Sequence, residues 1–290
     1  MDKIKVAILG TGNIGCDLLA KVLRSEYLEC ALFAGRRKES KGIAYAKPLG
    51  IKTAADSMAS VEENADNFDI LFDTTNAELH IQNGPLFRKL DKFVIDLTPS
   101  QVGDMCIPTI NLESSLDKQE INLISCGGQA TIPIAHVVKQ LYPEIEYVEN
   151  VTAISSKSAG PATRINIDNY VSTTQNAIMK FSGVKRAKVI LNINPAIPPI
   201  NMHNTTYIET KGDIDILLLT ASIKEMVKKV KKYVPGYNLF LGPIYENGVI
   251  TIMNEIIGKG DYLPPYAGNL DIITSAAVTV AEEYAKKRSK

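Results

Sequence analysis

A glycine-rich turn near the start of the chain constrains the fold more than any other feature. The run Gly10-Thr11-Gly12-Asn13-Ile14-Gly15 follows the apolar stretch 5–9 and opens a segment whose apolar residues recur at helical spacing. In a strand–turn–helix setting the first glycine permits a tight turn, and the second lets the backbone approach a pyrophosphate. The third allows the helix to pack closely on the strand, and the helix N-terminus offers N–H groups to an anion. The run therefore predicts a dinucleotide-binding site in a βαβ unit.

Short strand-like runs alternate with helical patterns through the first part of the chain. Besides 5–9, the sequence predicts strands at 28–34, 69–73, 93–97 and 122–125. Such alternation is typical of βαβ crossovers, so we expect an α/β fold with a Rossmann-type, doubly wound parallel sheet. This dinucleotide-binding domain is expected to span residues 1–128.

The pattern changes after about residue 144. Strand-like runs with one polar face come at 147–155, 187–194, 205–209 and 249–254, and helical runs lie at 169–181 and 223–233. This order predicts a second, α+β domain at residues 129–267, a mostly antiparallel sheet backed by helices that binds substrate and forms a homodimer. The last helical segment, 268–290, is expected to return to the first domain, with the active site in the cleft between the domains.

Charge and cysteine content exclude several classes of function. Lys and Arg number 32, as do Asp and Glu, so the basic surplus that nucleic acid or an anionic membrane needs is absent and neither partner is expected. No segment reaches the roughly 18 apolar residues of a membrane span, and the N-terminal residues lack a signal-peptide pattern. The four cysteines have no CxxC spacing, so we expect no metal. These features are typical of a cytoplasmic protein with free thiols.

The segment after the second predicted strand is where an adenosine ribose would be bound. It reads Gly35-Arg36-Arg37-Lys38-Glu39, without an acid at the end of the strand. An acid there would bind the ribose 2′-hydroxyl and favour NAD. Arg36 or Arg37 could instead hold the 2′-phosphate of NADP, or belong to a solvated basic loop, and the residues leave both readings open. The expected cofactor is therefore NAD or NADP.

Cys126 lies between a predicted strand and a helical pattern, in the run Ser125-Cys126-Gly127-Gly128-Gln129. Such a switch from strand to helix lies at the carboxyl edge of the sheet, where α/β proteins bind ligands. We expect the helix N-terminus to lower the pKa of this thiol. Gly127 and Gly128 are expected to leave room for a substrate and to offer N–H groups to an oxyanion. The sequence thus singles out Cys126 as a nucleophile.

The sequence places no histidine beside this thiol, and pairing with His80 or His203 would depend on the fold. His136 is too far along the same helix to reach Cys126, and His80 and His203 are remote in sequence, so structural roles are favoured for all three. From their spacing alone, the runs 158–166 and 262–271 are loops that lead into helices.

Taken together, these runs resemble the acylating acetaldehyde dehydrogenase family over essentially the whole chain. The resemblance lies in residues 10–15, 95–99, 125–133, 154–161, 163–164, 166–168 and 268–271. It implies that Cys126 carries an acyl thioester, that coenzyme A is a co-substrate and that a 4-hydroxy-2-oxovalerate aldolase is a partner. By the same resemblance the cofactor is bound by Gly10, Thr11, Gly12, Asn13, Ile14, Gly15, Ser158, Ala159, Gly160, Pro161, Ala162, Thr163, Arg164, Ile165, Asn166 and Asn269.

The chain departs from the family pattern at three places. Arg37 stands where the family typically has an acid, which questions a strict preference for NAD. His203-Asn204 replaces an Arg-Asp pair, so the candidate acid/base beside the cysteine is here Asn204, which cannot accept a proton as a carboxylate would. Ile197 replaces a glutamate.

The resemblance implies that the chain oxidises a short aldehyde, acetaldehyde or propanal, to acyl-CoA. Cys126 would attack the carbonyl, hydride would pass to NAD(P), and coenzyme A would displace the acyl group. One alternative is a phosphorylating or semialdehyde dehydrogenase of the same build. Another is a cofactor-binding regulator or scaffold without catalysis.

Overall fold

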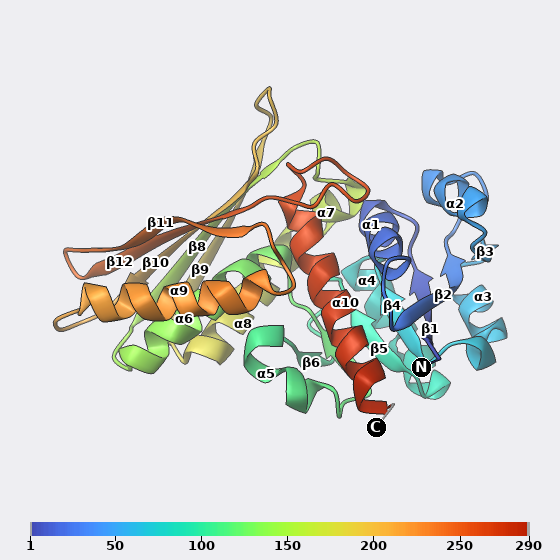
Figure 1. The fold of residues 1–290 in the computed structure, drawn as a ribbon, viewed down its shortest axis with the longest axis horizontal. Helices are drawn as coiled ribbons and strands as arrows, with labels where there is room; N and C mark the ends of the chain where they lie inside the picture. The colour runs from blue at the N-terminus through green and yellow to red at the C-terminus, as the bar shows by residue number, and fades with distance from the viewer. Residues whose placement is uncertain (1, 289–290) are drawn as a thin grey trace. The chain divides into compact units, whose positions relative to one another are not determined.

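The computed structural model describes residues 2–288, which form two compact units. One unit contains the chain before Ile124 and after Ile272, and the other contains Ile124–Ile272 (Figure 1). Within residues 2–288, no helix has both the length and the apolar character needed to cross a membrane.

The first unit is built on a parallel sheet with the strand order β3-β2-β1-β4-β5-β7-β6. Its strands are β1 (Ile4–Leu9), β2 (Leu28–Ala34), β3 (Thr53–Ala54), β4 (Ile70–Asp73), β5 (Phe93–Asp96), β6 (Asp104–Met105) and β7 (Glu120–Asn122). Its connecting helices are α1 (Asn13–Val22), α2 (Lys41–Ala46), α3 (Met58–Glu63), α4 (Ala77–Leu90) and α5 (Pro108–Ser115), with 3-10 turns at Lys47–Leu49 and Ala65–Asn67. The strand order reverses at β1, which has β2 on one side and β4 on the other, the point where doubly wound sheets bind ligands.

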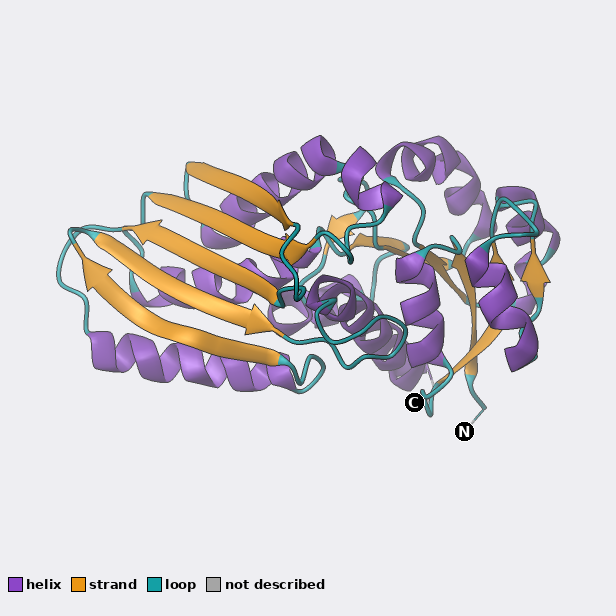
Figure 2. Ribbon diagram, turned by 90° about the horizontal axis from the view of Figure 1, so that it is seen from above, coloured by secondary structure: helices purple, strands orange, loops and turns teal. Residues whose placement is uncertain are grey.

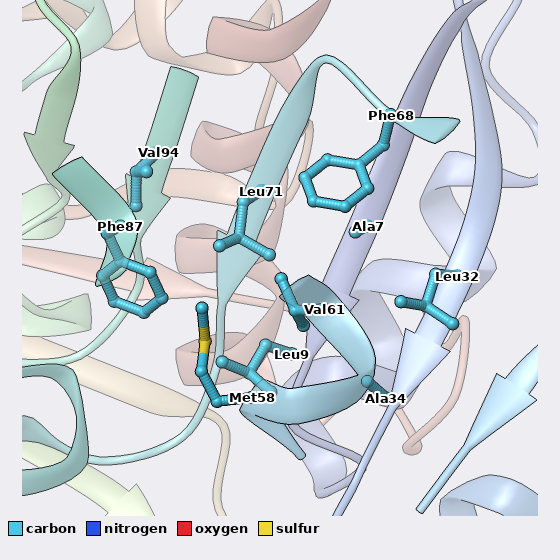
Figure 3. Packing of buried hydrophobic residues seen from close by; sticks show 10 residues of the cluster. All are labelled: Ala7, Leu9, Leu32, Ala34, Met58, Val61, Phe68, Leu71, Phe87 and Val94. Atoms are coloured by element: carbon cyan, nitrogen blue, oxygen red, sulfur yellow. The ribbon is translucent and has the colours of Figure 1, made fainter. Parts of the chain in front are cut away.

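The sheet is buried because its strands carry apolar residues on both faces. One face presents alternate residues of neighbouring strands, among them Leu9 of β1 and Leu71 of β4 (Figure 3). Met58 and Val61 of α3 pack on this face, as does Phe87 of α4. Near-continuous apolar runs are thus explained by helices on both sides of a parallel sheet.

The C-terminal helix α10 (Gly268–Arg288) packs in the first unit from residue 273 onward. The Thr274 hydroxyl donates to the buried carboxylate of Asp17 in α1 over 2.6 Å. Further along the helix, the ring of Tyr284 stacks on that of Phe93, with centroids 4.4 Å apart. These contacts confirm the expected return of the final helix.

The second unit is a five-stranded sheet with the order β11-β12-β10-β8-β9, antiparallel except for the parallel pair β8–β9. Its strands are β8 (Tyr147–Ser155), β9 (Arg186–Asn194), β10 (Met202–Glu209), β11 (Tyr237–Glu246) and β12 (Val249–Ile256). Its helices are α6 (Cys126–Leu141), α7 (Pro161–Ile165), α8 (Ile167–Ser182) and α9 (Ile216–Lys231), and α6, α8 and α9 cover one face of the sheet (Figures 1 and 2).

The predicted fold class is confirmed. The short strands β3 and β6 were not predicted, and two further strands differ from the sequence expectations. Strand β11 was not predicted, because Gly242-Pro243 interrupts its pattern. The strand tolerates this interruption because it lies at the edge of the sheet and its register shifts on either side of Leu241. The strand expected at 122–125 ends at Asn122, because Ile124 has a φ of 70° and turns the chain.

Candidate active site

Cys126 is the first residue of α6 and follows a strained turn. Ile124 has a φ of 70°, a conformation that is unfavourable for a β-branched residue. Ser125 caps the helix, because its hydroxyl accepts the N–H of Gly128 at 2.9 Å. The same hydroxyl lies 2.7 Å from Thr174 Oγ1, which itself donates to the carbonyl of Tyr170 at 2.6 Å. The start of α6 is therefore fixed to α8 by a chain of hydrogen bonds.

The Cys126 thiol differs from the other cysteines in exposure. Cys126 is partly buried, whereas Cys16, Cys30 and Cys106 are buried, and all four are free thiols. Loss of solvation raises the pKa of Cys126 to about 11, against the opposing effect of the N–H groups of Gly127 and Cys126 and of the Tyr170 hydroxyl. The expectation of a lowered pKa is therefore wrong, because desolvation outweighs the helix terminus.

Gly127 is required by its neighbours in the site. A Cβ at this position would lie 2.1 Å from the hydroxyl oxygen of Tyr170 and 2.9 Å from Thr152 Oγ1. The space beside Gly127 is therefore filled by protein side chains, contrary to the expectation of room for a substrate there. The N–H of Gly128 is likewise engaged by Ser125, so it is not free to bind an oxyanion.

Asn204 belongs to a buried network of neutral polar side chains on the helix-covered face of the second sheet. Its Oδ1 accepts from Thr152 Oγ1 at 2.8 Å and from Asn150 Nδ2 at 2.6 Å, and its Nδ2 donates to Thr131 Oγ1 at 2.9 Å. Thr152 in turn faces the hydroxyl of Tyr170. The connection from Asn204 to Cys126 therefore runs through Thr152 and Tyr170.

The histidines lie elsewhere. His203 is on the opposite face of the sheet from Asn204, where it contacts Phe240 edge-on and approaches Glu255 at 3.8 Å. His136 lies in α6, with Nδ1 3.3 Å from the carbonyl oxygen of Phe181. Both have the structural surroundings that the sequence favoured.

The third histidine, His80, is fully buried in the first unit between carboxylates. Its Nδ1 lies 2.8 Å from Asp73, and its Nε2 lies 2.7 Å from Glu120 and 3.4 Å from Asp96. Burial alone would lower the pKa of His80, but hydrogen bonds with Asp73 and Glu120 and the charges of Asp96 and Asp73 raise it to about 10. The arrangement of acids and imidazole could hold a metal ion, but each ring nitrogen already faces a carboxylate. The surrounding acids therefore favour the protonated form of His80.

The fold itself constrains two of the three glycines in the loop between β1 and α1. Gly10 has a φ of 113°, and a Cβ there would lie 2.4 Å from Thr74 Oγ1. A Cβ on Gly15 would lie 2.0 Å from the carbonyl oxygen of Gly10, so both positions need glycine for the fold itself. A Cβ on Gly12, at the N-cap of α1, would meet nothing within 4 Å. Packing within the protein does not explain glycine at position 12, whereas close approach of a ligand would.

The loop after β2 carries the predicted ribose contacts. Thr11 packs against Gly35 and Gly42, where any Cβ would collide with it, and its hydroxyl lies 3.1 Å from that of Ser40. Arg36 and Arg37 are exposed. The loop therefore presents the cations Arg36, Arg37 and Lys38 and the anion Glu39 to solvent, beside neutral hydroxyl groups.

The second group of predicted cofactor residues lies in the unit that contains Cys126. Ser158 and Ala159 are buried, Gly160 caps the short helix α7, and Arg164 and Ile165 are exposed. Asn166 is buried at the N-cap of α8. The buried Oδ1 of Asn269 has no hydrogen-bond partner within the described residues, which leaves it available to a ligand.

Sequence reasoning did not identify Tyr170, Thr152, Asn150 or Thr131. A usable signal was present in β8, where Asn150 and Thr152 alternate with the outward-facing residues and share a face with the buried Val148 and Ile154. Polar side chains at buried positions of a strand indicate a hydrogen-bonded network. No pattern of this kind marks Tyr170, whose place beside the sulfur depends on the packing of α8 against α6.

Comparison with known proteins identifies the family. A family model described as "Prokaryotic acetaldehyde dehydrogenase, dimerisation" matches residues 126–264. Acetaldehyde dehydrogenase of Spirochaeta aurantia is 47% identical over 98% of this chain and 95% of its own length. That of Geobacillus stearothermophilus is 47% identical over 99% of this chain and 98% of its own length.

A solved structure shows the same fold. Aspartate semialdehyde dehydrogenase II of Vibrio cholerae superposes with a TM-score of 0.65 over 99% of both chains, at 16% identity. The resemblance predicted from the motifs is confirmed by the relatives along the whole chain. The chain belongs to the acetaldehyde dehydrogenase family.

Proposed function

We propose that this protein oxidises a short-chain aldehyde, acetaldehyde or propanal, to the corresponding acyl-CoA, and that Cys126 carries the acyl group. One observation carries the proposal. Cys126, a partly buried residue at the start of α6, is held by a strained turn, and N–H groups and the Tyr170 hydroxyl are directed at its sulfur. The curated relatives are named for acetaldehyde, which supports the same class of substrate here.

In the proposed reaction the Cys126 thiolate attacks the carbonyl carbon and forms a thiohemiacetal, whose oxygen takes the electron pair of the C=O bond. The cofactor supplies a hydride acceptor, so the carbon is oxidised and an acyl thioester remains on Cys126. Coenzyme A, after its thiol has lost its proton to bulk water, then attacks the thioester carbon as thiolate, and the sulfur of Cys126 leaves as thiolate. Groups that stabilise negative charge on this sulfur therefore favour formation of the thiolate before the first step and its departure in the last step.

The residues of the first unit fit a nicotinamide dinucleotide. Gly10 and Gly15 shape the turn, while Thr11, Gly12, Asn13 and Ile14 would line the pyrophosphate with backbone N–H groups at the start of α1. Arg36 and Arg37 would contact the ribose side, which makes NADP acceptable beside NAD. The residues Ser158–Asn166 and Asn269, whose buried Oδ1 has no hydrogen-bond partner within the described residues, are the further cofactor contacts that we propose.

Asn204 is proposed to support the cysteine without accepting a proton. Its carboxamide oxygen holds the hydroxyl of Thr152 at 2.8 Å, and Thr152 faces Tyr170 beside the sulfur. A carboxylate at this position could take up a proton, whereas a carboxamide only fixes the direction of the hydrogen bond.

We also propose that the protein is a homodimer formed through the open face of the second sheet. This face carries exposed apolar side chains on three strands, Ile190, Tyr207 and Phe240, and the helices cover the other face. The matching family model is described as a dimerisation domain, which favours a second copy of the chain as the occupant. An aldolase that releases the aldehyde remains the partner implied by resemblance.

Steady-state assays with the Cys126→Ala variant test the proposed function. Acyl-CoA formation from acetaldehyde should be abolished while NAD(P) binding, measured by fluorescence, persists. Cys30→Ala, which changes a buried thiol in β2, is the matched control and should retain activity. Activity above a few per cent in Cys126→Ala would refute the mechanism. Turnover of the wild-type protein with phosphate in place of coenzyme A would support the phosphorylating alternative. No turnover with either acceptor would indicate a regulator without catalysis.

A further inference from the structure

The side chain of Tyr170 is buried beside the proposed nucleophile, yet its hydroxyl forms no hydrogen bond of good geometry. The hydroxyl faces Cys126 Sγ on one side and Thr152 Oγ1 on the other. Its position explains Gly127, since a Cβ there would lie 2.1 Å from the hydroxyl oxygen. Burial of a hydroxyl without a hydrogen bond costs free energy, so the position of the Tyr170 hydroxyl beside the Cys126 sulfur needs a physical reason.

The polar network limits the atoms that can accept a hydrogen bond from the Tyr170 hydroxyl. Thr152 Oγ1 donates to a carboxamide oxygen, either Asn204 Oδ1 at 2.8 Å or Asn150 Oδ1 at 3.0 Å. Because the Thr152 hydroxyl uses its one hydrogen in this bond, its oxygen can only accept a hydrogen bond from Tyr170. The phenol hydrogen therefore has two possible acceptors, the Thr152 oxygen and the Cys126 sulfur.

We propose that Tyr170 is a catalytic residue of this site, whose hydroxyl donates to Thr152 while Cys126 is a thiol and turns to donate to Sγ whenever the sulfur is negatively charged. This inference rests on the proposed function, because it assigns a role at the same cysteine. The charge on sulfur arises when the thiol proton leaves to bulk water, and again when the acyl group passes to coenzyme A. In both cases the phenol keeps its proton and supplies a charge-assisted hydrogen bond.

The electrostatics of the site agree with a donor that does not ionise. Burial and the neighbouring Cys126 hold the pKa of Tyr170 well above its ordinary value. The other side chains in the network, from α6, β8 and β10, are Thr131, Asn150, Thr152 and Asn204, all neutral near pH 7. No group of this network competes for the thiol proton, so the ionisation of Cys126 depends on hydrogen bonds to its sulfur.

The test measures thiolate reactivity without turnover. Alkylation of Cys126 by iodoacetamide at pH 8, mapped by mass spectrometry, should slow about threefold to tenfold in Tyr170→Phe. This estimate takes a rise of about one pKa unit from the lost charge-assisted bond, partly offset by the greater nucleophilicity of a more basic thiolate. The value of kcat should fall while KM for the cofactor stays unchanged. Gly127→Ala, which displaces the hydroxyl, should slow alkylation similarly.

The matched control is Tyr237→Phe. The Tyr237 hydroxyl is also buried and donates to the carbonyl of Ala130 in α6 at 2.7 Å, so its loss perturbs the same helix without touching the sulfur. Alkylation in this variant should stay within about twofold of wild type, well below the effect of losing a charge-assisted bond. The proposal is overturned if Tyr170→Phe is alkylated at the wild-type rate or if Tyr237→Phe slows as much. Because alkylation needs no aldehyde, these outcomes are independent of the Cys126→Ala result that tests the function.

Discussion

The buried His80 cluster makes the stability of the first unit dependent on pH in the alkaline range. His80 joins Asp73 at the end of β4 to Glu120 of β7, with Asp96 of β5 at 3.4 Å. Three carboxyl groups around one imidazole favour its protonated form. Protonated His80 can donate to both Asp73 and Glu120, whereas the neutral imidazole can donate to only one of them, so the contacts between the strands are strongest while His80 is protonated.

The change in the free energy of unfolding follows from the raised pKa of His80. The pKa of His80 rises from 6.5 to about 10 in the folded protein. A difference of about 3.5 units corresponds to about 5 kcal/mol. Since the folded pKa lies above the unfolded value, this contribution is fully present below pH 6.5 and is lost as pH rises toward 10. Between these limits the stability should fall by about 1.4 kcal/mol per pH unit.

Two measurements check this expectation. Nitrogen-15 NMR should show one imidazole, identified by its absence in His80→Gln, that stays doubly protonated up to pH 9. Hydrogen exchange of β4 and β5, corrected for intrinsic rates, should report the falling local stability without assuming that both units unfold together. In His80→Gln the same strands should lose about 3–5 kcal/mol near pH 7, because buried acids are left unpaired, and the alkaline slope should disappear. His136→Gln is the control and should keep the wild-type slope. An imidazole at position 80 that loses its proton below pH 7 would refute the reasoning.

Two further variants test the cofactor site and the dimer. Arg37→Asp should shift the ratio of kcat/KM from NADP toward NAD about tenfold or more, because a charge-assisted contact with the 2′-phosphate is lost. An unchanged ratio would show that the arginines are solvated and do not contact the cofactor. Tyr207→Lys on the open face of the second sheet should yield monomers by light scattering, whereas Leu217→Lys on α9, which is 84% exposed, should not; a Tyr207→Lys dimer would place the interface elsewhere.

The fold was predictable because its determinants are local. The apolar runs of β1 and β2 and the glycines between β1 and α1 specify a parallel βαβ unit from neighbouring residues alone. Strand β11 was missed for a local reason as well, since Gly242-Pro243 suggests a turn. Only the pairing with β12 makes this segment a strand, and pairing is not visible in the segment itself.

The candidate site was predictable only in part, because it depends on residues that are distant in sequence. The strand-to-helix switch and the resemblance to a family singled out Cys126, and the departure at Asn204 drew attention to a position on the same network. The connection between them consists of Thr152 on β8 and Tyr170 on α8, which reach the sulfur only through tertiary packing. Burial of the thiol, which reverses the expected direction of its pKa, is also a tertiary effect.

The structure contradicts the reason for which the sequence singled out Gly127. From the sequence, a glycine after the nucleophile indicates space for a substrate. In the structure that space is occupied by Tyr170 and Thr152, at distances that any Cβ would violate. The glycine therefore admits a protein hydroxyl to the sulfur, and the substrate must approach Cys126 from another side. Burial raises the pKa of the thiol, and the Tyr170 hydroxyl can donate to the thiolate and stabilise it. A sulfur that serves first as nucleophile and then as leaving group requires both a desolvated site and such a donor.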